Sequence, residues 1–245
     1  MKLAIIGNGN VGPHLEKALC EAGHEVKLLP TAEIERLIPD CDVVLLTVRD
    51  SAIPSVAAKV SALIPAFSGV LVHTAGSVPI DVLSPYARNY GVFYPMQTFS
   101  RQVPIADYRA IPLFIEGNSP ETVQILSTLA SSAFDSVTEC NGDRRKTLHL
   151  ASVFACNFTN ALWTIASDIL QADGLDFSAL HPLLKQTLEK ALSNSPLNSQ
   201  TGPAIRNDNA VMDAHLATLA NDLEKAKIYR LLSDYIINRH SHEQN

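Results

Sequence analysis

Short apolar runs alternate with stretches of helical spacing through the first part of the chain. The apolar runs predict strands at residues 3–6, 26–29, 42–48, 69–73, 92–94, 112–116 and 136–140. Helical spacing occurs over 14–22 and 53–64. Ser119 is suited to cap a further helix, because Pro120 follows it at the first helical position. This alternation predicts a mostly parallel, doubly wound sheet and therefore an α/β fold.

The first predicted strand runs directly into a Gly-x-Gly-x-x-Gly pattern at residues 7–12. In a dinucleotide-binding loop, Gly7 permits the tight turn, Gly9 lets the backbone approach a pyrophosphate, and Gly12 lets the following helix pack on the strand. Pro13 suits the start of that helix, and Gly23 suits its end. The alternative is a glycine-rich turn in another α/β protein, such as a methyltransferase.

From residue 142 onward the strand pattern disappears, and apolar spacing predicts helices over 143–172, 178–193, 209–220 and 222–239. We therefore expect two domains. Residues 1–141 form a Rossmann-like dinucleotide-binding domain with a mostly parallel sheet, and residues 142–245 form an all-helical domain for substrate binding and dimerisation.

The residue that usually selects the cofactor is missing. A dinucleotide fold commonly places Asp or Glu, or an Arg for a 2′-phosphate, at the tip of the second strand. Here that strand ends in Leu29-Pro30-Thr31. Glu33 is a candidate for binding the ribose, but an acidic residue in a first helical turn is also ordinary helix-dipole chemistry. The sequence leaves the cofactor as NADP or NAD.

Composition narrows the classes of protein. Hydrophobic residues make up 47% of the 245 residues and charged residues 18%, as in a globular protein. No apolar run is long enough to span a membrane, and no export signal is evident. The net charge of −6 argues against nucleic acid as a partner. Four widely spaced cysteines indicate neither a disulfide framework nor a metal site, and we expect a cytoplasmic protein.

A polar stripe interrupts the apolar segment 149–160. On a regular α-helix His149, Ser152, Cys156 and Asn160 share one face, with Asn157 at its margin. Polar groups on a buried helix need partners. Either the stripe forms a hydrogen-bonded seam between helices, or it lines a cleft.

Several segments together resemble a family of oxidoreductases that use NAD(P), in which a Rossmann-like domain precedes an uncharacterised helical domain. They are GNGNVG at 7–12, TVRDSAI at 47–53, VHTAGS at 72–77, YPMQTFS at 94–100, HLASVFACNFTNAL at 149–162, TGPAIRND at 201–208 and HLATL at 215–219. Wider relatives include pyrroline-5-carboxylate reductase, prephenate dehydrogenase and 6-phosphogluconate dehydrogenase. The chain departs from the pattern at Asn207, where the family is expected to have Gly, and in the shortened region after the second strand.

The resemblance implies a division of labour among the candidate site residues. The cofactor would contact Gly7, Asn8, Gly9, Asn10, Val11, Gly12, Thr47, Val48, Arg49, His73, Thr74 and Gly76. His149 would deliver or accept a proton, and Asn157 would orient the reacting oxygen. His73 has an alternative as a loop histidine satisfied by the backbone.

Substrate contacts are expected from Ser152, Asn160 and Arg206. A guanidinium binds a carboxylate through two parallel hydrogen bonds, so Arg206 would suit an acidic substrate. Its alternative is an ion pair with Asp208 or Asp213 that fixes the loop. Tyr94, Gln97 and Ser100 mark another possible substrate edge.

The sequence thus predicts hydride transfer between NADP or NAD and a small, carboxylated hydroxy or imino compound. The alternative is a non-catalytic dinucleotide-binding sensor or assembly protein. Apolar residues in 209–239 are spread too widely for one core-facing stripe, which predicts a homodimer through the C-terminal helices. The alternative is that they pack within the chain.

Overall fold

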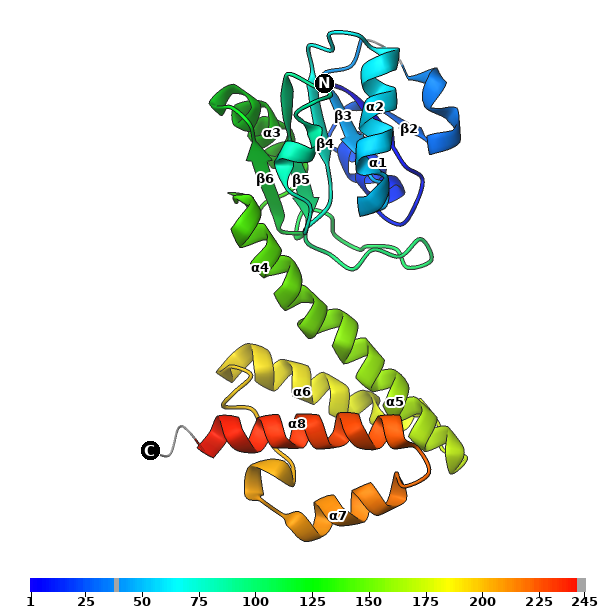
Figure 1. Cartoon of the computed structure of the whole chain (residues 1–245), viewed down its shortest axis with the longest axis vertical. Coiled ribbons are helices and arrows are strands. Elements are labelled where there is room, and N and C mark those ends of the chain that lie inside the picture. Colours follow the sequence, from blue (N-terminus) through cyan, green and yellow to red (C-terminus); the bar gives the residue numbers. More distant parts are fainter. Residues whose placement is uncertain (38–39, 242–245) are drawn as a thin grey trace. The chain divides into compact units, whose positions relative to one another are not determined.

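The computed structural model describes residues 1–37 and 40–241 and divides them into two compact units, the first ending at Asn157 and the second starting at Phe158. The predicted boundary between 141 and 142 lies at the start of α4 at Gly142, and the division into a dinucleotide-binding and a helical domain stays a prediction. Each unit is described below by itself (Figure 1).

Unit 1 contains a seven-stranded sheet in the order β2-β1-β3-β4-β5-β6-β7. The strands are β1 (Lys2–Ile6), β2 (Glu25–Leu29), β3 (Val43–Leu46), β4 (Val70–His73), β5 (Asn89–Pro95), β6 (Leu113–Gly117) and β7 (Val137–Glu139). Every neighbouring pair is parallel except β5 and β6. The mostly parallel α/β sheet predicted from the apolar runs is therefore confirmed.

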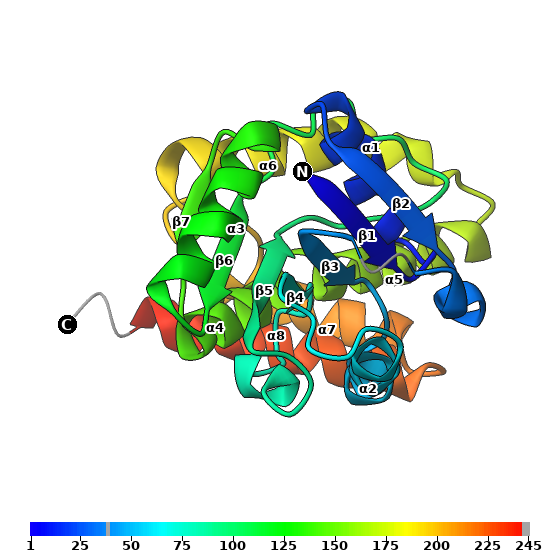
Figure 2. The ribbon, with the colours of Figure 1, turned by 90° about the horizontal axis from the view of Figure 1, so that it is seen from above.

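Helices cover both faces of this sheet (Figure 2). They are α1 (Gly12–Glu21), α2 (Ile53–Leu63) and α3 (Pro120–Ala133), and Ser119 caps α3 by accepting from Thr122 N–H, as predicted. Successive side chains of a strand point to opposite faces. Leu3 and Ile5 accordingly join the core beneath α1 and α3, whereas Ala4 and Ile6 join the core beneath α2. Because both faces are buried at the centre of the sheet, β3 and β4 are almost continuously apolar, whereas the edge strands β2 and β7 carry charged or polar residues.

The helical part of the chain begins with α4 (Gly142–Ser152), which belongs to unit 1. A π-helical segment (Val153–Phe158) follows, and then α5 (Thr159–Ala172). The prediction of one continuous helix over 143–172 is corrected here, because the hydrogen-bond pattern widens in the π segment. Unit 2 continues with α6 (His181–Asn194), α7 (Asn209–Thr218) and α8 (Leu223–Ser241). Within the described residues, no helix has the combination of length and apolarity that crossing a membrane requires.

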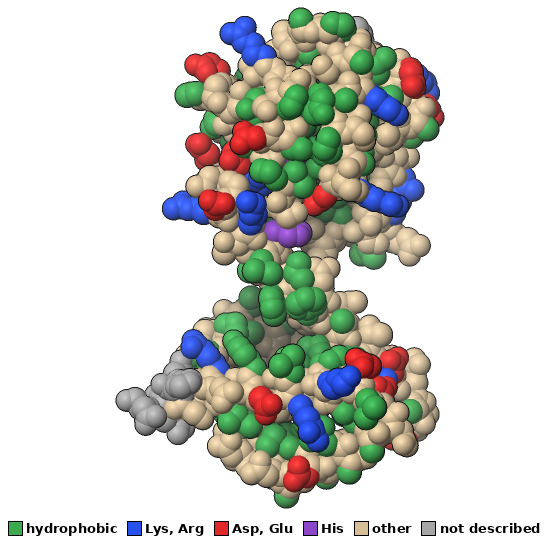
Figure 3. Space-filling view, in the orientation of Figure 1, with side chains coloured by type: hydrophobic (Ala, Val, Ile, Leu, Met, Phe, Trp, Pro, Cys, Tyr) green, Lys and Arg blue, Asp and Glu red, His purple; other side chains and the backbone are tan. Residues whose placement is uncertain are grey.

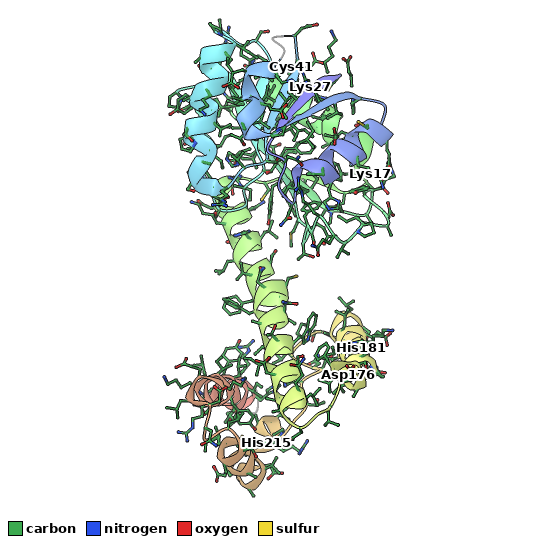
Figure 4. All side chains as sticks on the ribbon, turned by 90° about the vertical axis from the view of Figure 1, so that its right-hand side faces the viewer. Lys17, Lys27, Cys41, Asp176, His181 and His215 are labelled. Atoms are coloured by element: carbon green, nitrogen blue, oxygen red, sulfur yellow. The ribbon has the colours of Figure 1, made fainter. Side chains whose placement is uncertain are left out.

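Unit 2 buries little of its own apolar surface. Ala204 and Met212 are the buried residues among its described part. Some polar contacts join its helices. His215 on α7, labelled in Figure 4, lies 2.9 Å from the hydroxyl of Tyr229 on α8, and Lys225 on α8 pairs with Asp168 on α5 at 3.5 Å. The segment 149–160, expected to be a buried helix, has exposed apolar residues, with Phe154 62% and Phe158 50% exposed.

Candidate active site

The register of the parallel strands brings the candidate segments to one edge of the sheet. Ile6 pairs with Leu46, Leu46 with His73, and His73 with Val92. The glycine loop and the segments 47–49 and 74–76 each begin directly after one of these strand ends. Ligands of open α/β sheets bind outside the carboxyl ends of the strands. The fold therefore places the candidate cofactor residues of three separate segments at the edge where such ligands bind.

Close backbone contacts fix the shape of the glycine loop. Gly7 has φ +122°, and a Cβ atom there would lie 2.5 Å from the carbonyl oxygen of Thr47. A Cβ atom on Gly12 would lie 2.1 Å from Gly7 O. Thr47 holds the loop from the neighbouring strand by donating its hydroxyl to Gly7 O at 2.7 Å. Gly7 and Gly12 thus serve the turn and the helix packing predicted for them.

Gly9 differs from these two glycines, because a Cβ atom there would meet nothing within 4 Å. The space beside it is part of a pocket of about 370 Å³, lined by Gly7, Asn8, Gly9, Thr31, Thr47, Val48, Arg49, Ala52 and Val56. Arg49 is the charged residue of this lining, and within the described residues its guanidinium has no hydrogen-bond or ion-pair partner, whereas its backbone oxygen accepts from Ala52 N–H. The donor set suits a phosphorylated ligand: free backbone N–H groups at a helix start, a hydroxyl and an unpaired cation.

At the tip of β2, Glu33 lies in a short 3₁₀ helix (Thr31–Arg36) and forms an ion pair with Arg36. Its carboxylate is thus engaged by a neighbour three residues along the chain. This ion pair supports a structural role for Glu33 rather than binding of the ribose. Thr31 is the residue at the tip of β2 that lines the pocket.

Tyr94, Gly76 and His149 meet at the same edge of the sheet. The Tyr94 hydroxyl lies 3.3 Å from His149 Nδ1, and a Cβ atom on Gly76 would lie 2.7 Å from that same nitrogen. Glycine at position 76 therefore allows the imidazole to lie against the backbone of the loop after β4. Burial raises the pKa of Tyr94, with the charge of Arg145 opposing the shift, so this hydroxyl keeps its proton at neutral pH and remains a donor.

His73 precedes this loop and is completely buried. Its Nδ1 accepts a hydrogen bond from Ala75 N–H at 3.2 Å. Burial, reinforced by the charge of Arg145, lowers the pKa of His73 to about 4. The backbone contact of Nδ1 supports a structural role for His73, although the buried Nε2 has no hydrogen-bond partner within the described residues. Its neighbour Thr74 is partly exposed and donates its hydroxyl to Leu46 O at 3.3 Å.

A buried ion pair fixes the start of α4 and with it the position of His149. The Arg145 side chain is inaccessible to solvent, pairs with Glu116 at the end of β6, and donates to Val78 O at 2.6 Å. Glu116 also accepts from Gly142 N–H at 3.1 Å. Sequence reasoning missed this pair, because its two members are 29 residues apart and each looks like an ordinary surface charge.

The other residues of the polar stripe do not gather around His149 and Tyr94. Ser152 is partly buried and donates to Leu148 O, while Asn157 and Asn160 are exposed. The π segment from Val153 to Phe158 changes the angular spacing of the side chains, so the stripe residues do not share the single face that a regular α-helix would give them. Asn157 ends unit 1, and Asn160 belongs to unit 2.

Arg206 lies in unit 2 and is exposed. No ion pair joins it to Asp208 or Asp213 in the described structure; Asp208 instead caps α7 by accepting from Val211 N–H. Asn207 adopts the left-handed conformation, with φ 52° and ψ 37°. This explains the departure from the expected glycine, because Asn tolerates this conformation better than most side chains.

Sequence reasoning also missed Arg101, whose guanidinium contacts the glycine loop from the segment after β5. The sequence feature that could have pointed to Arg101 is its position directly after residues 94–100, one of the segments that carry the family resemblance. Among the described residues, no group of three or more His, Cys, Asp or Glu side chains is arranged to hold a metal ion.

Comparison with known proteins places this geometry in context. Residues 111–236 match the family model described as "Domain of unknown function (DUF2520)". A protein of Bacteroides fragilis, provisionally described as an NADP oxidoreductase, is 34% identical, with a TM-score of 0.90 over 97% of this chain and 98% of that one. No curated protein sequence matches the chain.

Two more distant structures share the fold. A Thermotoga maritima protein is 21% identical, with a TM-score of 0.71 over 99% of this chain and 100% of that chain. Pyrroline carboxylate reductase of Plasmodium falciparum, with NADP bound, is 14% identical, with a TM-score of 0.58 over 98% of both chains.

Proposed function

We propose that this chain, which belongs to the family described as "Domain of unknown function (DUF2520)", is an NAD(P)-dependent oxidoreductase. Its 34% identity to a protein provisionally described as an NADP oxidoreductase supports this proposal. The reaction is hydride transfer between NADP or NAD and a small, carboxylated hydroxy or imino compound. One observation carries this proposal: the open glycine loop and the Tyr94–His149 pair lie at the same edge of the sheet.

The cofactor residues in this proposal are the glycine loop, Thr47, Val48, Arg49, Thr74 and Gly76. Backbone N–H groups at the start of α1 bind the pyrophosphate, and Gly9 gives it room. Arg49 is the charged residue of a pocket lined without an acid, which suits the 2′-phosphate of NADP better than a bare ribose diol. When bound, the nicotinamide supplies or takes the hydride.

His149 moves the proton that accompanies the hydride. In the protonated imidazolium, Nδ1–H donates to the Tyr94 oxygen, which orients the ring. Nε2–H gives its proton to the oxygen or nitrogen of the substrate as the hydride reaches the adjacent carbon, which leaves a neutral imidazole, and the reverse reaction returns the proton to Nε2. Asn157 orients the reacting oxygen, and Ser152 contacts the substrate. The substrate roles of Asn160 and Arg206, which belong to unit 2, stay predictions from the sequence.

A substrate screen with a His149 variant tests the assignment. Small hydroxy and imino acids are screened for an absorbance change at the nicotinamide band. With the substrate found, His149→Ala lowers turnover by about 100-fold or more and leaves cofactor affinity unchanged. His215→Ala, which removes a histidine from α7, is the matched control and retains turnover.

Two results would contradict this assignment. If His149→Ala lowers the melting temperature while catalysis per folded molecule stays the same, His149 serves only to join helices. If the chain binds dinucleotide and no substrate class produces an absorbance change, the non-catalytic sensor becomes the better hypothesis.

We also propose that two chains pair through unit 2. Its exposed apolar residues include Leu183, Leu188, Leu192, Leu223, Leu231 and Tyr235, each at least 60% exposed. Hydrophobic side chains are visible between α6 and α8 on the face drawn in Figure 3. Patches of this kind usually contact a partner, and a closed two-fold dimer is the commonest arrangement.

Light scattering on the full chain tests the dimer. We expect a mass of about twice 26.5 kDa, falling toward the monomer when Leu188 and Leu192 of α6 are both replaced by Glu. Lys185→Glu on the same helix is the control and leaves the dimer intact. A mass of 26.5 kDa that persists at high protein concentration would exclude the dimer.

The widely spaced cysteines support a cytoplasmic location, which stays a prediction.

A further inference from the structure

Arg101 contacts the glycine loop from a segment far away in the sequence. Its Nε donates to Gly9 O at 3.1 Å, and its Nη2 donates to both the backbone and the side-chain oxygen of Asn8. Within the described residues, its Nη1 group has no hydrogen-bond partner. A guanidinium carries five N–H donors, so Arg101 can hold the loop and still bind another acceptor.

The segment that carries Arg101 is anchored on α1. His14 Nε2 donates to Ser100 O at 3.0 Å, and the Tyr108 hydroxyl lies 2.8 Å from His14 Nδ1. With Nε2 as the donor, Nδ1 accepts the proton of Tyr108. Lys17, labelled in Figure 4, lies 5.6 Å above the Tyr108 ring. These contacts to the first turns of α1 keep Arg101 beside the start of that helix.

Arg101 differs in its partners from three arginines of unit 1 that form ion pairs. Arg36, Arg109 and Arg145 each pair with a carboxylate, whereas the partners of Arg101 within the described residues are neutral oxygens. Its positive charge therefore stays uncompensated beside Gly9, where the space is open. An uncompensated cation beside free helix N–H groups attracts an anion.

We propose that Arg101 is a further cofactor-binding residue, which binds the pyrophosphate of a dinucleotide held on the glycine loop. This inference rests on the proposed function. The pyrophosphate is the ligand group that approaches the backbone at Gly9, whereas the part of a dinucleotide that distinguishes NADP from NAD lies near the tip of the second strand, here Thr31. Arg101 therefore acts equally on NADPH and NADH.

Calorimetric titration of the full chain at low and high salt tests this role. The variant is Arg101→Gln, and the matched control is Arg109→Gln, which removes the same charge from the same segment at a residue paired with Asp135. The probes are NADPH, NADH and ADP-ribose, which share the pyrophosphate. We expect Arg101→Gln to weaken all three by at least about tenfold and to reduce the salt dependence of Kd, with the melting temperature unchanged.

The outcomes separate this inference from the proposed function. If the wild-type chain binds none of the probes, the proposed function fails. If it binds them and Arg101→Gln binds equally well, the inference fails while the function stands. A loss confined to NADPH would assign Arg101 to the 2′-phosphate instead. A loss with unchanged salt dependence would show that Arg101 only shapes the loop, and would also overturn the inference.

Discussion

His73 links the stability of unit 1 to pH. Its pKa in the folded protein is about 4, because the ring is buried and lies near the charge of Arg145, whereas the usual value is 6.5. A proton added to Nδ1 would also face the Ala75 N–H that this nitrogen accepts. Between pH 6.5 and 4, the unfolded chain therefore binds a proton at His73 that the folded chain does not. Stability falls as the pH falls through this range.

The size of the effect follows from the two pKa values. Lowering the pH from 7 to 5 protonates His73 almost fully in the unfolded chain and very little in the folded one. The free energy of unfolding should fall by about 2 kcal/mol from this residue alone. His73→Asn removes the titration, while its side-chain oxygen can accept from Ala75 N–H in place of Nδ1.

Urea unfolding of both proteins at pH 7 and pH 5 measures this difference. Other groups titrate in both proteins, so they cancel in the comparison. We expect the wild type to lose about 2 kcal/mol more than His73→Asn on going to pH 5. Equal losses in the two proteins would refute the account of a buried, neutral His73.

Two further predictions concern the site. Gly76→Ala places a Cβ atom 2.7 Å from His149 Nδ1, shorter than the 3.4 Å at which ordinary contact begins, so the ring must move. Turnover at saturating cofactor should fall by about 100-fold, and unchanged turnover would contradict the position given to His149. Glu33→Ala should leave the ratio of NADH to NADPH affinities within about twofold, because the carboxylate pairs with Arg36 and exposed pairs of this kind contribute little. A strong preference for NAD that disappears in Glu33→Ala would show that Glu33 binds the ribose.

Local features of the fold were predictable from the sequence because they depend on short-range physics. The apolar runs of the central strands, the N-cap of α3 at Ser119 and the steric roles of Gly7 and Gly12 all follow from neighbouring residues. The family resemblance is likewise confirmed. The roles assigned to His149 and Asn157 stay predictions, although the contact of His149 with Tyr94 and Gly76 supports the first.

Features that depend on contacts distant in sequence were not predictable. The Arg145–Glu116 pair and the contact of Arg101 with the glycine loop join residues 29 and more than 90 positions apart. The π segment was missed because a regular period was assumed across 149–160. The apolar pattern of that segment indicated burial, but a single chain leaves Phe154 and Phe158 exposed, since a pattern does not say what covers it.

The most direct test of the central claim is calorimetric titration of NADPH and NADH into the wild-type chain and Gly9→Val. A side chain at position 9 meets no protein atom within 4 Å, so the variant should fold and melt as the wild type does. We expect the wild type to bind dinucleotide, and the variant to lose binding because its side chain occupies the space of the pyrophosphate. Equal affinity in the two proteins, or no binding by the folded wild type, would contradict the account.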